Sequence, residues 1–443
     1  MMLRHTQLSA IALSLCTVLG CGGTESLPDL DDAQRDLTSA VAVFPGAEGF
    51  GTDTPAGRGG DIVWVTNLDD DGPGSLRVAL RTEGPRTILF EVGGVIQLER
   101  RLDVTEPFVT VAGQSAPAPG ITLVGAALSI QTHDVLVQHL AARPGDGPGQ
   151  EPEDRDGVQV RTESGVREDV YNVVVDHVSM TWAIDEGFST WTPGVEDVTL
   201  SHCLVAETLN DSLHPGGPHS KAILIGDHTR RVAVLRNVIA HNRHRNPELK
   251  GDSTSLVVGN LIYNPGFSAI GAFDPNGAGP LLSTILDNEI RLGPSSESTA
   301  PAITVWDDVP EGSHLWFDAN VTDGDVVSRD DTGRDDVFIE EAPVWVSPLT
   351  RSTAPRDALL AHVGSRGAER DPNDARIIDS IRSGTGRIID AVEEVGFVRP
   401  AAQRARPTLP PRPLEDDDGD GYTNLEGWLH QRAEEVSGWT GPD

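Results

Sequence analysis

Cationic and acidic side chains in a few short segments are the residues of this sequence best suited to chemistry. Arg245 and Lys250 stand close together, and Lys221 precedes Arg245 by 24 residues. Upstream, segments 153–158 and 182–189 carry several carboxylates. The planar donor fork of arginine suits a carboxylate ligand, whereas lysine offers a point charge. Grouped carboxylates suit a hard cation such as Ca²⁺, which takes about six to eight oxygen ligands.

The two acidic segments place their carboxylates differently. Asp154 and Asp156 stand two residues apart, so on an extended strand they would point to the same face. Asp185 and Glu186 are adjacent, and either one could supply the next ligand. For both segments, an exposed acidic turn is the alternative interpretation.

Short runs of Val, Ile and Leu, separated by turn residues, are the elements that must position these groups. The runs are each followed within one to three residues by His or Asn, at steps of roughly 23 to 38 residues. Such a period is typical of stacked supersecondary repeats. In a parallel β-helix, one such position per coil can form an internal polar ladder. We therefore assign to a ladder, rather than to catalysis, the residues His139, His177, His202, Asn237, Asn260, Asn288 and Asn320.

Motifs spread over much of the chain resemble polysaccharide lyase family 1, the pectate lyases. Segment 175–177 (Val-Asp-His) and, about 70 residues later, segment 245–250 (Arg-Asn-Pro-Glu-Leu-Lys) are similar to the family's DH pair and RxPxxR motif. Lys250 stands in place of the second arginine. The resemblance covers residues 42–325 and implies an all-β fold, a right-handed, single-stranded parallel β-helix with an N-terminal capping helix that starts at Ser75.

The resemblance also implies an activity, the cleavage of pectate, an acidic plant cell-wall polysaccharide, by calcium-assisted β-elimination. That reaction removes the C5 proton of a galacturonate, next to its carboxylate, and expels the C4 oxygen. The implied catalytic residues are Arg245, the general base, and Lys221, which contacts a substrate carboxylate. The implied substrate-binding residues are Lys250, Arg243 and His219, and the implied Ca²⁺ ligands are Asp154, Asp156, Asp185 and Glu186. Ser189 stands where known members place a further carboxylate.

An arginine base requires explanation, because arginine ordinarily keeps its proton. The resemblance implies that calcium and neighbouring cations disfavour the protonated form of Arg245. Two alternatives remain: Arg245 only pairs with a carboxylate, or His244, whose ordinary pKa suits a base, takes the proton.

The amino terminus predicts an exported protein. Residues 1–20 combine a basic start with an apolar run too short to span a bilayer, which is typical of a signal peptide. Cys21 follows in a setting that resembles the lipobox of bacterial lipoproteins, so we expect it to be lipidated, with a plain cleaved signal as the alternative. Residues 21–40 are expected to be a flexible tether. We expect a bacterial protein that is an outer-membrane or cell-surface lipoprotein, or secreted, and that contacts the membrane only through the lipid.

Composition limits the partners. The formal net charge of −34 and the pI of about 4.6 argue against a nucleic-acid ligand. The same charge should repel an acidic polymer at long range, but screening over about 8 Å at physiological salt leaves the outcome to local cations and bound calcium. With 47 glycines, 31 prolines and 5% aromatic residues, the chain suits a turn-rich solenoid, which we expect to be monomeric.

The carboxyl end predicts a separate module beyond a main domain that covers 41–400. Residues 401–415 are expected to be a Pro-rich linker, and 416–436 an EF-hand-like or dockerin-like calcium loop with a short helix. Glu426 comes one residue before the twelfth loop position, and a disordered acidic tail is the alternative. The expected ligands are Asp416, Asp418, Asp420, Asn424 and Glu426. Within 41–400, short helices are expected over 373–383 and 386–394.

A different class of function remains open. A non-catalytic β-helix could bind polysaccharide, or act as an adhesin, through the same cleft. A β-helical hydrolase is disfavoured, because glycoside hydrolysis uses two carboxylates about the scissile bond, whereas this chain offers an arginine within an acidic cluster.

Overall fold

The computed structural model describes residues 41–162, 170–322, 325–326, 334–344 and 356–441. Residues from Val41 onward form one compact unit. The predicted signal peptide 1–20, Cys21 and the tether 21–40 lie outside the described residues. In the part of the chain that is described, no helix is both long enough and apolar enough to cross a bilayer.

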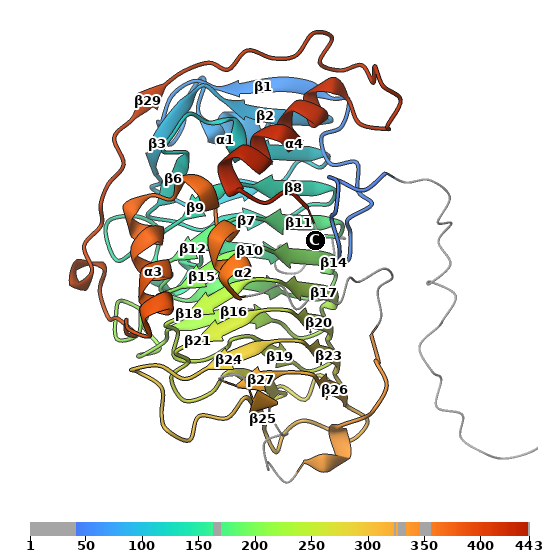
Figure 1. Cartoon of the computed structure of the whole chain (residues 1–443), viewed down its shortest axis with the longest axis vertical. Coiled ribbons are helices and arrows are strands. Elements are labelled where there is room, and N and C mark those ends of the chain that lie inside the picture. Colours follow the sequence, from blue (N-terminus) through green and yellow to red (C-terminus); the bar gives the residue numbers. More distant parts are fainter. Residues whose placement is uncertain (1–40, 163–169, 323–324, 327–333, 345–355, 442–443) are drawn as a thin grey trace, which may run out of the picture. The chain divides into compact units, whose positions relative to one another are not determined.

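Three sheets form the solenoid, and each coil adds one strand to each sheet (Figure 1). The first sheet contains β1 (Asp61–Val65), β2 (Arg86–Phe90), β5 (Val109–Ala112), β8 (Val135–Gln138), β11 (Val173–Asp176), β14 (Glu196–Ser201), β17 (Arg230–Leu235), β20 (Thr254–Val258), β23 (Leu282–Leu286) and β26 (His314–Asp318). The second contains β3 (Val92–Gln97), β6 (Ile121–Val124), β9 (Leu140–Ala142), β12 (Ser179–Thr181), β15 (Leu204–Ala206), β18 (Val238–Ala240), β21 (Leu261–Tyr263), β24 (Glu289–Arg291), β27 (Val321–Thr322), β28 (Asp325–Val326) and β29 (Gln403–Arg404). The third contains β4 (Leu102–Val104), β7 (Leu128–Ile130), β10 (Val158–Arg161), β13 (Glu186–Trp191), β16 (Lys221–Ile225), β19 (Glu248–Lys250), β22 (Ile270–Phe273) and β25 (Ile303–Val305).

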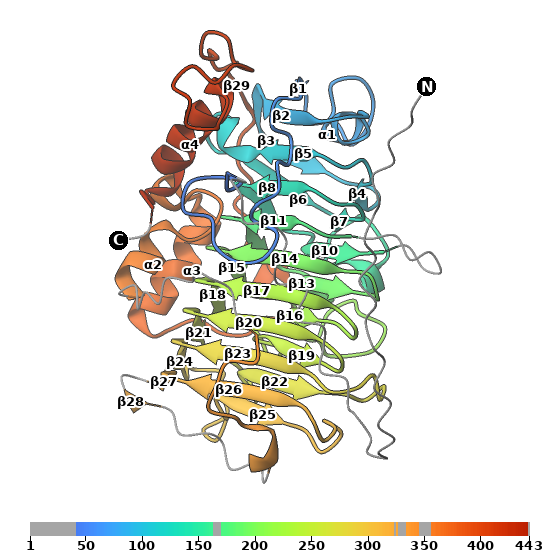
Figure 2. The same ribbon diagram turned by 90° about the vertical axis from the view of Figure 1, so that its right-hand side faces the viewer.

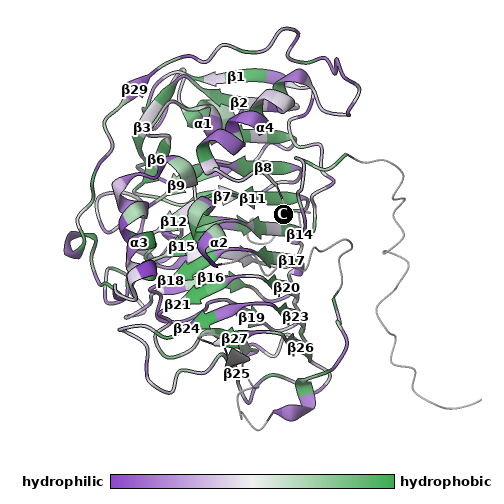
Figure 3. Cartoon of the chain, in the orientation of Figure 1, coloured by the Kyte–Doolittle hydropathy of each residue, from purple (hydrophilic) through white to green (hydrophobic). Residues whose placement is uncertain are grey.

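The strands pair in parallel and in register, except that β28 and β29 each pair antiparallel with a neighbour. Val135, Val173, Val198 and Val232 stack on successive coils of the first sheet. β-Branched residues favour this pleated surface, and their inward side chains build one continuous core. Hydrophobic residues accordingly dominate the strands, whereas hydrophilic residues are frequent in the loops and helices (Figure 3). The predicted right-handed parallel β-helix is confirmed.

The asparagines of the predicted ladder form a buried row between the first and second sheets. The side chain of Asn237 donates to Asn260 Oδ1 (3.0 Å), Asn260 donates to Asn288 Oδ1 (2.9 Å), and Asn288 donates to Asn320 Oδ1 (2.8 Å). Their amides also donate to strand carbonyls of the preceding coil. The ladder therefore satisfies buried backbone groups at the corner of each coil, as predicted.

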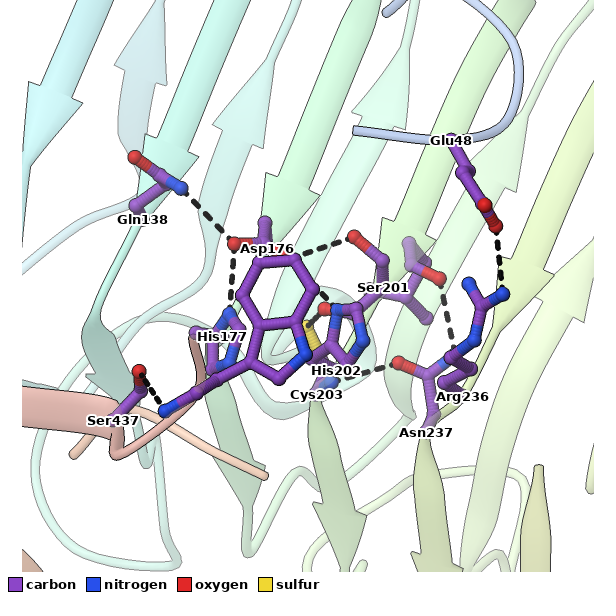
Figure 4. A network of polar contacts seen from close by, with 12 residues as sticks. Glu48, Gln138, Asp176, His177, Ser201, His202, Cys203, Arg236, Asn237 and Ser437 are labelled. Atoms are coloured by element: carbon purple, nitrogen blue, oxygen red, sulfur yellow. Dashed lines mark hydrogen bonds and ion pairs between the residues drawn. The ribbon is translucent and has the colours of Figure 1, made fainter. Parts of the chain in front are cut away.

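The histidines belong to a different row, so the prediction of a single ladder was wrong. His139, His177 and His202 directly follow their strands and adopt the left-handed conformation, with φ between 50° and 58°. Their rings stack with centroids 5.1 and 4.9 Å apart. Figure 4 shows Asp176 between His177 and His202, with contacts to Gln138 and Ser201. An offset of one residue from the asparagine position turns these side chains away from the core and toward the C-terminal segments.

Short helices complete the unit. In α1 (Leu76–Leu80), the predicted capping helix, Ser75 Oγ accepts from Val78 N, and Leu76 and Leu80 join the core. The helices α2 (Arg356–His362) and α3 (Pro372–Ser383) pack on the second sheet, away from the strands of the third sheet (Figure 2). The 3₁₀ turns are η2 (Gly113–Ser115), η3 (Pro152–Asp154), η4 (Asp335–Val337), η5 (Gly367–Glu369) and η6 (Val392–Glu394).

Segment 386–394 is not the predicted helix. Gly384, in the left-handed conformation, ends α3, and only Val392–Glu394 forms a 3₁₀ turn. The residues between them are bound to the solenoid instead, since Asn210 N donates to Ile389 O at 2.9 Å. The helix predicted over 373–383 is confirmed.

The C-terminal helix α4 (Asn424–Ser437) is docked on the coils. Leu425 and Leu429 are buried against Leu89 and Ala112 of the first sheet. Glu426 pairs with Arg58 at 2.8 Å. The helix itself was predicted, but its reading as an appendage separate from the β-helix was wrong, because its apolar face is buried on the solenoid.

The segment predicted as a linker is likewise held by the solenoid. Within 401–415, β29 pairs antiparallel with β3, and Arg404 and Arg406 pair with Glu91. The guanidinium of Arg406 also lies 4.1 Å from the centre of the Trp64 ring. These contacts hold the segment against the surface of the solenoid before α4 begins.

Candidate active site

A polar cavity of about 280 Å³ lies on the outer face of the third sheet. Its lining residues are Glu153, Asp154, Asp156, Gln159, Arg161, Asp185, Glu186, Ser189, Trp191, His214, His219, Lys221, Leu224, Arg245 and Lys250. A larger hollow of about 670 Å³ lies beside α3, but there Arg376 and Glu207 pair with each other, and no group of converging carboxylates is found there among the described residues. The smaller cavity is therefore the candidate site.

Successive coils bring the predicted residues together. Glu186 on β13 is in register with Lys221 on β16, and Lys221 bridges to His244 on the next coil. Arg245 follows directly, with φ of 60°, a left-handed conformation that is uncommon for a side chain of this size. Residues more than 20 positions apart in the chain thus lie about one strand spacing apart in space.

Asp156, Asp185 and Glu186 form the acidic cluster of the cavity. One carboxylate oxygen from each lies within 4.8 Å of the others. Asp156 Oδ2 accepts from Ser189 Oγ at 2.6 Å, whereas the buried Asp156 Oδ1 has no hydrogen-bond partner among the described residues. Both members of the adjacent pair Asp185 and Glu186, between which the sequence could not choose, belong to the cluster.

Asp154 does not share the position of Asp156. The two residues are not on an extended strand as predicted, because Asp154 ends the 3₁₀ turn η3 and β10 begins only at Val158. Asp154 is exposed at the cavity rim, whereas Asp156 is 1% exposed. Asp154 therefore lines the cavity without joining the three-carboxylate cluster.

Burial disfavours the ionised form of the three carboxyl groups in the acidic cluster. Burial raises the pKa of Asp156 well above its ordinary value, and Asp185 and Glu186 add to this effect. Burial also raises the pKa of Asp185, against the lowering effect of Lys221. For Glu186, burial and then Asp185 raise the pKa to about 7, although Arg245 and Lys221 oppose the shift. Crowded, desolvated carboxylates of this kind favour the uptake of a cation.

This donor set fits calcium. It consists of hard carboxylate oxygens, one of which is buried and has no hydrogen-bond partner in the described part of the chain. Substrate carboxylates or water can supply the remaining ligands. A second group in the same lining, Asp185 with His214 and His219, also brings three ligand atoms within 4.8 Å of one another, but imidazoles suit transition metals, whereas the all-carboxylate group suits calcium.

The cations lie directly beside the cluster. Lys221 Nζ lies 3.7 Å from Asp185 Oδ1 and 3.8 Å from Glu186 Oε1. The guanidinium of Arg245 pairs with Glu186, and its Nε lies 3.3 Å from Glu248 Oε1 without hydrogen-bond geometry. The predicted alternative, that Arg245 pairs with a carboxylate, thus describes its present contacts, and those contacts also aim it into the cavity.

The remaining predicted residues divide into two groups. Lys250 and His219 line the cavity, with His219 Nε2 at 3.4 Å from Asp185 Oδ1. Arg243 and His244 are not among the lining residues, and both pack on Phe267. Burial, and then Arg245, lower the pKa of His244 to about 3, so its ring is a weak base.

Several residues of the cavity were missed by sequence reasoning. They include Arg161 and Trp191 at the ends of β10 and β13. Glu248, inside the 245–250 motif, was missed as well; it lies beside Arg245 Nε without being one of the lining residues. The available signal was alternation. In segments 158–161 and 188–191, apolar or small residues that face the core alternate with polar or aromatic residues that face outward.

The C-terminal loop only partly matches the predicted calcium site. Asp416, Asp418 and Asp420 offer oxygens within 4.8 Å of one another, and all three are exposed. The side chain of Asn424 instead donates to the carbonyls of residues 411 and 412, and Glu426 accepts from Thr423 as the helix capping box and pairs with Arg58. These contacts engage the carboxylate of Glu426 in the helix cap, whereas those of Asn424 involve only its Nδ2, so a ligand role for Asn424 Oδ1 stays a prediction.

Comparisons with known proteins identify the family and the fold. No family model matches the sequence. A protein named probable pectate lyase C from Aspergillus flavus is 31% identical over 403 residues, which cover 87% of this chain and 86% of the relative. The protein of the same name from Emericella nidulans is 32% identical over 400 residues, covering 87% and 85%. These alignments are longer than the predicted stretch of resemblance, 42–325. Both relatives are fungal, and the bacterial origin expected from the sequence stays a prediction.

Solved structures share the fold. The major allergen of cedar pollen superposes with a TM-score of 0.51 at 19% identity, covering 76% of this chain and 92% of the allergen. A Bacillus subtilis pectate lyase variant gives 0.52 at 12% identity, covering 74% and 98%. A pectate lyase bound to a hexasaccharide gives 0.52 at 12% identity, covering 74% and 99%. With the fungal relatives aligned over most of its length and these structures sharing its β-helix, the chain belongs to the pectate lyase family of polysaccharide lyases.

Proposed function

We propose that this protein cleaves pectate-type polyuronides by calcium-assisted β-elimination in the cavity of the third sheet. The observation that carries the proposal is the meeting of three carboxylates with Lys221 and Arg245 in one cavity. A carboxylate cluster alone would be a cation site, and cations alone would be an anion site. Together they suit a metal ion shared with an anionic sugar.

Asp156, Asp185 and Glu186 would hold the calcium. Calcium bound there would offset the charge of the uronate carboxylate and so stabilise the negative charge that builds up as the C5 proton leaves. Lys221, whose Nζ lies within 3.8 Å of both Asp185 and Glu186, would contact the same carboxylate as a point charge.

Arg245 is the proposed general base. With the side chain of Arg245 as a neutral guanidine, the C5 proton moves to its unprotonated nitrogen, the electron pair forms the C4–C5 double bond, and the C4–O bond breaks, with the departing oxygen protonated by water. Glu248, beside Nε, keeps the guanidinium aimed into the cavity. The transfer requires Arg245 in its neutral form, so turnover should increase toward alkaline pH.

The test is incubation with polygalacturonate and calcium. The proposal predicts an ultraviolet-absorbing, unsaturated product that chelation of calcium suppresses. New reducing ends without any unsaturated product would indicate hydrolysis. Retention on polygalacturonate without any product would favour the alternative, a non-catalytic binding or adhesive β-helix.

We further propose that the protein is exported and lipidated at Cys21. The support is the signal-like segment 1–20 and the lipobox-like setting of Cys21. Incorporation of labelled palmitate in a lipoprotein-processing bacterial host should occur in the native chain and be lost in Cys21→Ala. A Cys21→Ala chain that still takes up label would contradict the assignment.

A further inference from the structure

The cavity extends along β10 and β13 beyond the acidic cluster. Arg161 and Trp191, the last residues of these strands, are direct partners in register. Val160 and Phe188 on the same strands are core residues, so alternation directs Arg161 and Trp191 outward, where both line the cavity. Trp191 is five residues along β13 from Glu186, or about 16 Å at the rise of a strand. The two side chains therefore lie beyond the reacting centre but within the same cavity.

Arg161 has no ion-pair partner among the described residues, although acidic residues are abundant in the sequence. The sequence holds 68 acidic residues against 34 basic ones. Arg143 pairs with two aspartates, and Arg155 donates to three backbone carbonyls. By contrast, Arg161 forms no ion pair with any described residue, and its buried Nε lacks a hydrogen-bond partner. A desolvated guanidinium nitrogen without a partner is costly, and an external carboxylate would satisfy it with two parallel hydrogen bonds.

Trp191 supplies an apolar surface beside this cation. It is 42% exposed, an unusual state for an indole that adjoins a core strand. The ring lies against Gly226 on the next coil, where a Cβ would come within 3.1 Å of it. Lys250 follows one coil further, held 4.4 Å above the centre of the Phe273 ring. The absence of a side chain at 226 thus leaves room for the indole between the coil that carries Arg161 and the coil that carries Lys250.

We propose that Arg161 and Trp191 form a second uronate subsite, in which the indole stacks on a sugar ring and the guanidinium binds that sugar's free carboxylate. This inference rests on the proposed function, since it places a neighbouring sugar of the same polymer. The subsite selects unesterified uronate, because a methyl ester removes the charge that Arg161 binds but leaves the ring face that Trp191 contacts.

The test is calorimetric titration with trigalacturonate and with its methyl ester, in an Arg245→Lys background so that the ligand is not consumed. Arg161→Gln should weaken trigalacturonate binding about tenfold and leave the ester's affinity unchanged, because only the free acid offers a charged acceptor. Trp191→Ala should weaken both ligands to a similar degree, about threefold to tenfold, and Trp191→Phe should restore most of the loss. Arg432→Gln, on the exposed side of α4, is the matched control and should bind like its parent.

The outcomes separate this inference from the proposed reaction. Unchanged affinities in Arg161→Gln and Trp191→Ala would overturn the subsite even if the native enzyme yields unsaturated product. Native protein that yields no such product, while Arg161→Gln shows the acid-specific loss, would overturn the reaction and keep the subsite. Equal losses for acid and ester in Arg161→Gln would overturn the assignment of Arg161 to the carboxylate.

Discussion

At the scale of single residues, the cavity holds three clustered carboxylates whose negative charges repel one another when no cation is bound. Burial raises the pKa values of Asp156, Asp185 and Glu186. Lys221 and Arg245 oppose this rise at Asp185 and Glu186. Such an arrangement costs stability and is typical of functional sites. Single substitutions can remove the charge of each residue, or keep the charge and change the functional group.

Replacing Arg245 by lysine keeps the positive charge but not the guanidinium. The variant should fold and bind substrate, yet lose about 10²- to 10⁴-fold in turnover, the usual contribution of a general base. Arg243→Lys is the control and should stay near the native rate, because Arg243 packs on Phe267 outside the cavity lining. Initial rates of unsaturated product measure both, and an Arg245→Lys variant retaining more than about a tenth of the native rate would exclude Arg245 as the base.

The three clustered carboxylates should behave as one metal site. Asp156→Asn, Asp185→Asn and Glu186→Gln should each raise the calcium concentration needed for half-maximal activity, and their effects should not add, because the ligands share one ion. Asp154→Asn should have a smaller effect, since Asp154 lies at the rim. Calorimetric titration with calcium gives a readout independent of turnover. Identical calcium affinities in all four variants would mean that the ion binds elsewhere.

At the scale of elements, the corner between the first and second sheets carries two parallel polar rows with different roles. The asparagine row satisfies the backbone inside the solenoid. The histidine row faces outward, where His362 of α2 and Trp439 pack against it. The C-terminal segments therefore cover a stack of buried imidazoles.

This stack makes stability depend on pH. Burial lowers the pKa of His202 to about 4 and that of His139 to about 3, below the ordinary value of about 6.5. Between these values the unfolded chain binds more protons than the folded one, so the free energy of unfolding should fall as pH drops from about 6.5 toward 4. Denaturant titrations across this range measure the slope, and His202→Asn should reduce it. An unchanged slope in that variant would mean that other groups control acid unfolding.

At the scale of the whole molecule, the C-terminal residues serve the solenoid rather than the cavity. α4 buries Leu425 and Leu429 on the first sheet, and Trp439 contacts the histidine row. The cavity lies on the third sheet, and none of the described residues after 409 is part of its lining.

Deleting everything after Leu409 should accordingly lower stability and leave the chemistry intact. Two buried leucines alone are worth about 1.5–3 kcal/mol each. We expect a lower melting temperature, with turnover on soluble polygalacturonate and its calcium requirement preserved at low temperature. Leu429→Ala should reproduce part of the loss, about 2–5 kcal/mol, whereas Leu414→Ala, 46% exposed, should have little effect. A truncated chain that melts like the native one would show that the docking contributes no stability.

The sequence by itself determined the repeat, the fold class and most members of the site. Hydrophobic runs with turn residues at a regular period specify a stacked parallel solenoid, because each coil can bury its apolar face only on its neighbours. Lys221 and Arg245, which the resemblance assigned to one site, stand 24 residues apart, close to one coil, and lie on neighbouring coils in the structure. These properties depend on the local residue pattern and on the repeat length, and both can be read from the sequence alone.

Only the tertiary structure decided which way certain side chains point and where the C-terminal helix packs. A shift of one residue separates His202 from the asparagine row, and a 3₁₀ turn separates Asp154 from Asp156. Likewise, the face that α4 buries depends on a matching surface on the first sheet, several hundred residues away in the chain. Side-chain direction alternates with every residue of a strand, so an uncertainty of one residue in the strand boundary reverses what a side chain faces. Three-dimensional packing, not local pattern, removes that uncertainty.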